Sequence, residues 1–104
     1  MIITTTETVP SKEISEILGV ARGSTVRSKH IGNDIFAGLK TIVGGEIHEY
    51  TKLQADAREQ ALQRLEEDAE RLGADAVVNI RMATSMIMSG ASEILVYGTA
   101  VKLT

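Results

Sequence analysis

The chain of 104 residues contains no cysteine and no tryptophan. The absence of cysteine excludes a disulfide framework, a thiol nucleophile and a thiolate metal site. The aromatic residues are limited to Phe36, Tyr50 and Tyr97. The core must therefore be built from aliphatic side chains and alanines, which bury less area per residue, so a monomer would have a thin core.

The chain also lacks a strong charge of one sign and any long apolar run. Its formal net charge of −3 does not favour nucleic acid, which needs a clustered basic surface. A modest basic cluster of Arg22, Arg27, Lys29 and His30 is interpreted as a solvated surface loop. No stretch is long enough to span a membrane, and the N-terminus has no signal-peptide pattern. We expect one cytoplasmic domain covering residues 1–104.

The sequence up to the glycine pair predicts three elements. Residues 2–5 are β-branched and predict a short strand. Residues 13–27 are ambiguous, because apolar positions recur at helical spacing but two glycines interrupt them, and periodicity narrowly favours a helix for the first part. A short helix is predicted to start at Asn33 or Asp34 and to end at Val43 before a glycine pair.

The clearest element is a long amphipathic helix. A capping-box pattern places its start near Thr51 or one turn earlier, and Gly73 ends it after Leu72. Its charged residues alternate in sign and are interpreted as a solvated face. The apolar stripe, which is rich in alanine and predicts close packing on a sheet, consists of Leu53, Ala57, Ala61, Leu65, Ala69 and Leu72.

The last third predicts a hairpin that turns at residues 89–92. The return strand carries apolar residues on both faces, with Leu95 and Tyr97 on one and Val96 on the other. The two helices of one chain can cover only one face of the sheet. The apolar residues on the second face therefore predict a homo-oligomer, and Val96→Lys should dissociate it. The first strand of this hairpin is expected to place its alternating apolar residues on one face. They are Ala76, Val78, Ile80, Met82, Met86 and Met88.

Three groups of residues are candidate metal ligands, and none forms a recognised motif. The thioethers of Met82, Met86 and Met88 could bind copper(I), but apolar core packing is the favoured interpretation. His30 and His48 are the only imidazoles and are interpreted as surface or supporting residues. A cluster of Glu46, His48 and Glu49 before the long helix could bind zinc if symmetry brings copies together, or could simply complement the helix dipole. The metal ligands thus stay unassigned.

No catalytic constellation is visible. Gly19 and Gly23 are spaced almost like a phosphate-binding loop, but the spacing is one residue short and the lysine is missing. Neither histidine is placed to activate a serine or threonine. The sequence therefore predicts a protein that is not an enzyme and nominates no catalytic or cofactor-binding residue.

Several segments in order resemble the YbjQ family over essentially the whole chain. They are Met1–Thr6, Gly38–Gly45, Tyr50–Ala61, Gly73–Ala76 and Gly98–Val101. The family consists of small bacterial and archaeal proteins of unestablished function, often labelled as heavy-metal-binding. The resemblance implies a dodecin-like α+β subunit in a closed ring, most simply a pentamer, and it implies that residues 13–27 form a strand.

Together these observations predict a small antiparallel sheet packed with one short and one long helix. The expected function is that of a homo-oligomeric binding module, with a heavy metal or small ligand at subunit interfaces. The alternative is a structural or interaction ring that holds no small ligand. The sequence identifies neither the ligand nor any partner other than the chain itself.

Overall fold

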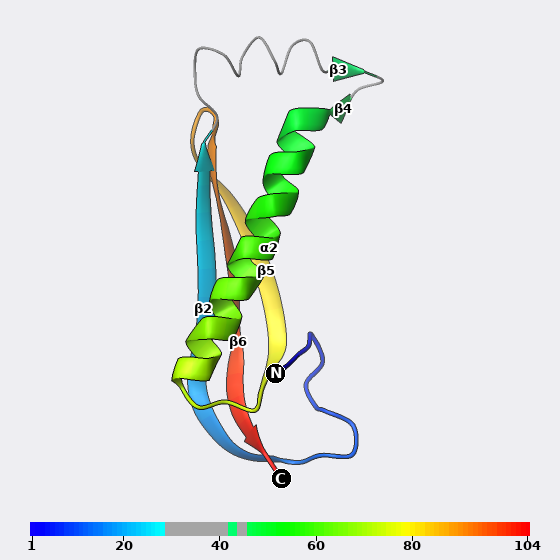
Figure 1. The fold of residues 1–104 in the computed structure, drawn as a ribbon, viewed down its shortest axis with the longest axis vertical. Coiled ribbons are helices and arrows are strands. Elements are labelled where there is room, and N and C mark those ends of the chain that lie inside the picture. Colours follow the sequence, from blue (N-terminus) through cyan, green and yellow to red (C-terminus); the bar gives the residue numbers. More distant parts are fainter. Residues whose placement is uncertain (29–41, 44–45) are drawn as a thin grey trace.

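The computed structural model describes residues 1–28, 42–43 and 46–104, and it has an α+β fold (Figure 1). A four-stranded sheet has the order β1-β5-β6-β2. Strand β1 is parallel to β5, and the other pairs are antiparallel, so the sheet is mixed and not wholly antiparallel as predicted. The elements are β1 (Ile2–Ile3), β2 (Ile14–Ser28), β3 (Ile42–Val43), β4 (Glu46–Ile47), α2 (His48–Arg71), β5 (Ala76–Met88) and β6 (Ala91–Leu103).

Strand β2 occupies the ambiguous segment, so the resemblance was right and the periodicity was wrong. Its pairing with β6 shifts register twice, between Ile14 and Glu16 and between Ile17 and Gly19. Gly19 has φ of +131°, a conformation that side chains rarely allow. Such β-bulges change the two-residue alternation along a strand, which made the apolar spacing resemble that of a helix.

The described ranges contain one helix, α2, where the sequence predicted a short helix as well. Most of the predicted short helix falls on residues 29–41, outside the described residues. Its predicted end is wrong, because Ile42 and Val43 form strand β3, which pairs with Ile47 and Glu46 of β4. The long helix is confirmed with the earlier of its two predicted starts, at His48.

Helix α2 covers one face of the sheet along β2 and β6 (Figure 1). The predicted alanine stripe is buried there, with Ala57, Ala61 and Ala69 against strand residues such as Ala21 and Val96. Gly23 of β2 makes the closest approach, because a Cβ atom there would overlap the Ala61 carbonyl oxygen and the Leu65 amide nitrogen. Small side chains on both elements therefore let the helix backbone lie almost directly on the strand.

A bulge in β5 reverses which side chains face the helix. Asn79 has φ of +55°, and the register with β6 shifts between Val78 and Arg81. Ala76 and Val78 therefore pack in a cluster on the face away from the helix, whereas Ile80 packs in the helix-side core. The prediction that alternate residues from Ala76 to Met88 share one face is wrong, because an inserted residue exchanges the two faces.

Strand β6 has apolar residues on both faces, as predicted. Val96 is fully buried in the helix-side core, and Val101 is buried on the opposite face against Val9 of the N-terminal segment. Tyr97, on that opposite face, remains exposed. The expectation for Val96→Lys is thus wrong, because a lysine there would disrupt the core of one subunit before any interface.

Within the described ranges, no helix combines the length and the apolar character needed to cross a membrane.

The close approach at Gly23 predicts a severe effect of a small substitution. Gly23→Ala should lower the free energy of unfolding by about 2 kcal/mol or more, because the added methyl group meets main-chain atoms that cannot rotate away. Ser24→Ala, at a half-buried neighbouring position, is the control and should change stability by less than about 0.5 kcal/mol. Urea unfolding followed by circular dichroism measures both, and equal midpoints would contradict the packing argument.

Candidate functional site

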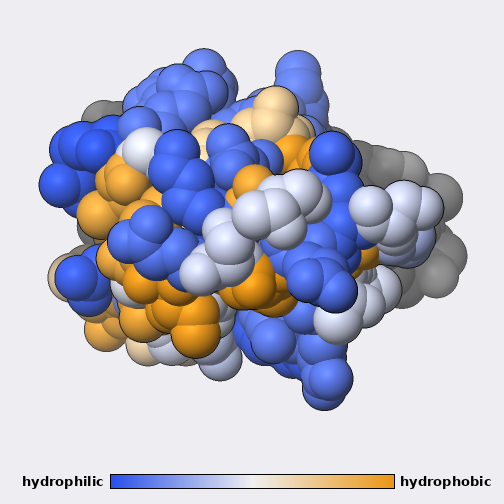
Figure 2. Space-filling model, turned by 90° about the horizontal axis from the view of Figure 1, so that it is seen from below, coloured by the Kyte–Doolittle hydropathy of each residue, from blue (hydrophilic) through white to orange (hydrophobic). Residues whose placement is uncertain are grey.

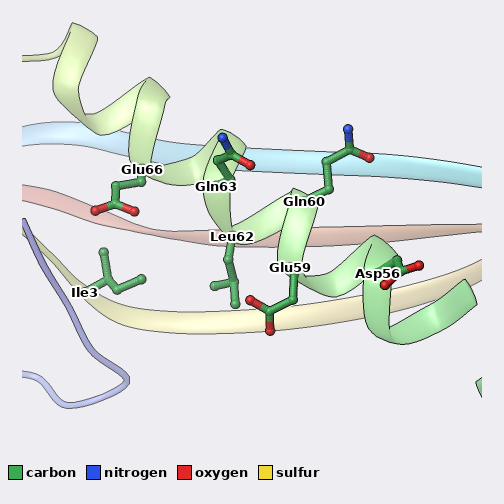
Figure 3. A pocket seen from close by; sticks show the side chains of 7 residues that line it. All are labelled: Ile3, Asp56, Glu59, Gln60, Leu62, Gln63 and Glu66. Carbon is green, nitrogen blue, oxygen red and sulfur yellow. The ribbon is translucent and has the colours of Figure 1, made fainter. Parts of the chain in front are cut away.

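An open groove runs along the outer surface of α2, where Ile3 of β1 and residues of the helix line it (Figure 3). Its volume is about 560 Å³, which is within the range of small-molecule sites. Leu62 and Ile3 supply its apolar part, and Leu62, Glu59 and Glu66 extend from the helix toward the strand side (Figure 3). The full lining is Ile3, Asp56, Glu59, Gln60, Leu62, Gln63 and Glu66.

The groove is acidic but does not converge on one ion. Its charged lining residues are Asp56, Glu59 and Glu66, and no basic residue lines it. Glu59 and Glu66 are seven residues apart, which separates them by roughly 10 Å along a helix. In the described part of the chain, no three histidine, aspartate or glutamate side chains are grouped to hold a metal ion.

Residues on the flank of α2 next to β2, including the groove residue Gln60, contact that strand. Arg64 donates from Nη1 to the Ser24 carbonyl oxygen at 2.6 Å, and Arg27 of β2 donates from Nη2 to Gln60 Oε1. Arg71 pairs with Asp68, whose Oδ2 accepts the Arg22 amide hydrogen at an N···O distance of 3.0 Å. Helix side chains thus satisfy two main-chain groups on the outer edge of β2.

Asp68 is the one described acid with a clearly shifted pKa. The hydrogen bond from Arg71 is the largest cause that lowers its pKa, and the Arg22 amide lowers it further, while partial burial opposes both. The shift comes from its role in joining α2 to β2. It marks a structural contact and not an acid poised for proton transfer.

The three methionines of β5 are exposed, so their interpretation as core residues is wrong. Met82, Met86 and Met88 have exposed fractions of 43%, 80% and 64%. Met82 and Met86 lie on the helix side of the sheet, opposite Val96 and Ser92, but α2 lies over β2 and β6 instead. The face reversal at Asn79 and the position of β5 beside the helix-covered strands explain this exposure.

The other candidate ligands lie where the structure gives no side-chain positions. His30 falls outside the described residues. The backbones of Glu46, His48 and Glu49 belong to β4 and the first turn of α2, and the prediction for these side chains stays untested.

Motifs that drew attention in the sequence have structural roles. Gly73 has φ of +78° and ends α2, where the Ala74 amide donates to the Ala69 carbonyl oxygen. Asp75 Oδ2 then accepts the Leu103 amide hydrogen and fixes the end of β6. The basic cluster is not a loop in its first part, because Arg22 and Arg27 belong to β2.

From the sequence, the acids that line the groove were interpreted as part of a solvated helix face. The helical positions of these residues could have indicated a site. Glu59 and Glu66 lie on the flank toward β5 (Figure 3), whereas Arg64 and Arg71 lie on the flank toward β2. A helical projection separates these flanks, but it cannot show which strands lie beneath them.

One known protein family matches the whole chain. A family model described as "Putative heavy-metal-binding" matches residues 1–104. The chain belongs to the YbjQ family. A UPF0145 protein of Archaeoglobus fulgidus is 64% identical over 103 residues, covering 99% of this chain and 95% of that protein. A UPF0145 protein of Methanosarcina acetivorans is 60% identical, with 99% and 97% covered.

One solved structure supports the fold of this YbjQ protein. A protein of unknown function of the DUF74 family from Pediococcus pentosaceus matches with a TM-score of 0.63. The match covers 100% of this chain and 98% of the other, at 18% sequence identity. At that identity the likeness concerns the fold alone.

The lowered pKa of Asp68 predicts an acid-sensitive contact. Its contribution to stability is fully present above the unfolded value of about 3.9 and is lost as pH falls through the lower folded pKa. Asp68→Asn should therefore reduce the unfolding free energy by about 1 kcal/mol at pH 7, and the difference from the unsubstituted protein should shrink below about pH 4.

Urea titrations between pH 3 and pH 7 measure this difference. Glu67→Gln, which removes one negative charge at an exposed position of the same helix, is the matched control for the change in net charge. A constant gap between Asp68→Asn and the unsubstituted protein across this range would contradict the assigned pKa shift.

Proposed function

We propose that this YbjQ protein is a cytoplasmic, non-catalytic binding module that works as a homo-oligomer, with a metal ion or small ligand held at subunit interfaces. The resemblance noted in the sequence favours a closed pentameric ring. The family description favours a metal as the ligand. Two features of the subunit support the proposal: its exposed apolar surface and the groove beside α2.

The observation that carries the proposal is where apolar side chains are exposed. Among the described residues, eleven large hydrophobic side chains are exposed, of which four lie on β2 and four on β5. These are the two outer long strands, whereas β6 between them contributes only Tyr97. Scattered exposed hydrophobics are ordinary, but concentration on sheet edges favours association. The β2 and β5 residues are Ile14, Ile17, Val20, Val26, Met82, Met86, Ile87 and Met88.

Val20, Val26 and Tyr97, here called the apolar stripe, share the face away from α2, with Arg22 and Ser24 between the two valines on β2. Cross-strand partners share a face, and Val26 pairs with Glu93 while Val20 pairs with Thr99, two positions on the same face as Tyr97. Val20 and Val26 are 60% and 59% exposed. Figure 2 shows hydrophobic residues reaching the surface in several groups at the lower end of the molecule. A covering subunit would remove these side chains from water.

The groove beside α2 supports the proposal that the protein binds a small ligand. Residues of α2 and Ile3 of β1 line it, and it combines apolar side chains with carboxylates and amides. Such a composition suits a small ligand that needs a few polar contacts. A ligand held there would be accessible to residues from a second subunit.

A second candidate function is a structural or interaction ring without a small ligand. The separation of Glu59 and Glu66 along α2 favours it, because one subunit then presents scattered carboxylates instead of a metal-binding set. Both candidate functions require the same homo-oligomer. They differ in whether it holds a metal ion or small ligand.

Native mass spectrometry of untagged protein, combined with metal analysis, separates these functions. An assembled mass with a stoichiometric metal or small molecule supports the binding module. An assembled mass that stays bare after exposure to zinc, copper and nickel supports the structural ring, while a monomer would contradict both.

The apolar stripe gives a direct test of assembly. Val26→Lys should lower the assembled mass, because burial at an interface would force a lysine charge out of water without a partner. Thr8→Lys adds the same charge at an exposed position of the N-terminal segment and should leave the mass unchanged. Size-exclusion chromatography with light scattering measures both variants, and an unchanged mass for Val26→Lys would remove the stripe from the interface.

A further inference from the structure

Two arginines and a tyrosine lie side by side on three neighbouring strands. Arg22 of β2 is the cross-strand partner of Tyr97 of β6, and Arg81 of β5 pairs with the same tyrosine from the other side. Cross-strand partners lie one strand spacing apart, so the Cα atoms of the two arginines are about 10 Å apart with the tyrosine between them. We call this set the arginine–tyrosine row.

The row lies on the face of the sheet away from α2. Each of its members has a neighbour in the chain that is buried on the helix side, and these neighbours are Ala21, Val96 and Ile80. Successive side chains of a strand point to opposite faces, so the row faces away from the helix. Both arginines are exposed, and Tyr97 is 40% exposed. The row is therefore accessible in the subunit.

The guanidinium of Arg22 is available to a ligand. Its amide hydrogen is bound by Asp68, but within residues 1–28, 42–43 and 46–104 no acceptor binds its side chain. Asp68 is already paired with Arg71, whose hydrogen bond is the main cause of its lowered pKa, and the charge of Arg22 contributes least to that shift. An anion can thus bind Arg22 without breaking an ion pair of the described chain.

The guanidinium of Arg81 is anchored by main-chain oxygens. Its Nη1 donates to the Ile80 carbonyl oxygen at 2.9 Å and to the Thr5 carbonyl oxygen at 3.2 Å. These contacts fix its position and leave its charge without an acid partner among the described residues. Glu93 shares the face of the row, but it is four residues from Tyr97, roughly 14 Å along β6. The surroundings of the tyrosine ring are therefore positive.

This charge matters when the face is covered. The row crosses the apolar stripe at Tyr97, so a subunit that covers the stripe would also remove two unpaired arginines from water. Burial of an unpaired charge is costly, and an anion bound between the arginines would offset that cost. A metal cation would instead be repelled by both side chains. The row therefore favours an anionic ligand on this face.

We infer that the arginine–tyrosine row binds a small anion that carries a flat ring. The ring stacks on Tyr97, Arg22 donates hydrogen bonds to the anionic group, and Arg81 adds positive charge from the other side. Stacking on an aromatic ring and charge-assisted hydrogen bonds to phosphate or carboxylate are the contacts that these side chains supply. This inference rests on the proposed binding module and specifies its small ligand.

Three probes separate the two contacts. Adenosine 5′-monophosphate (AMP) joins a flat ring to a phosphate, whereas adenosine lacks the anion and inorganic phosphate lacks the ring. AMP should bind at least about tenfold more tightly than either, because each of the others loses one contact. Equilibrium dialysis measures the three Kd values, and NMR shifts of the labelled full chain locate the binding. Added salt should weaken the binding of AMP more than that of adenosine.

Substitutions assign the contacts to residues. Arg22→Gln should raise the Kd for AMP about tenfold, because hydrogen bonds to its phosphate are lost, and Arg81→Gln should raise it about threefold. Tyr97→Thr should raise the Kd for AMP at least about fivefold and leave that for inorganic phosphate unchanged. Arg58→Gln removes the same charge at an exposed position of α2 and should have little effect. Circular dichroism checks that each variant is folded.

The outcomes distinguish this inference from the proposed oligomer. If the unsubstituted protein assembles but Arg22, Tyr97 and Arg81 show no NMR shift at about 10 mM AMP, this inference alone is overturned. Equal Kd values for AMP and inorganic phosphate, or equal effects of Arg22→Gln and Arg58→Gln, would also overturn it. A monomer that binds AMP through the row would support this site and contradict the proposed oligomer.

Discussion

The contact between Gly23 and the backbone of α2 fixes the position of every other feature. A helix packs at the shortest distance where both surfaces carry small side chains, and here a glycine on β2 meets an alanine stripe centred on Ala61. The helix is therefore held over β2 and β6, near one side of the sheet. In the part of the chain that the structure describes, no helix covers the far half of β5, and the groove lies along α2. The candidate site is thus a consequence of where the smallest residues lie.

Much of the fold could be predicted from the sequence, because its main signals are local. The start and stop of α2, its alanine stripe and the hairpin between β5 and β6 depend on capping, periodicity and turn residues that lie close together in the chain. The strand at residues 14–28 could not be obtained in this way. Its apolar spacing is altered by bulges, and its conformation is decided by pairing with β6, which lies more than 60 residues later.

The candidate site was less predictable for a related reason. A single bulge at Asn79 reverses the faces of β5, and no nearby residue pattern announces it. The methionines beyond it were assigned to a core that the strand does not reach. The groove acids were visible as charges, but only the packing of α2 shows that Glu59 and Glu66 share a flank away from Arg64 and Arg71. Site composition was therefore readable, while site geometry depended on tertiary contacts.

The one-sided position of α2 also bears on the outer edge of β2. Both outer strands carry basic side chains, with Arg81 on β5 and Arg22 and Arg27 on β2, so charge alone does not distinguish the two edges. Asp68 and Arg64 also bind main-chain groups in the middle of the β2 edge, so pairing there must use the uncapped parts of the strand or displace these side chains. Partial capping of this kind limits uncontrolled edge-to-edge growth and still permits one register with a complementary partner. Specificity in edge pairing would then come from which main-chain groups of β2 are left free.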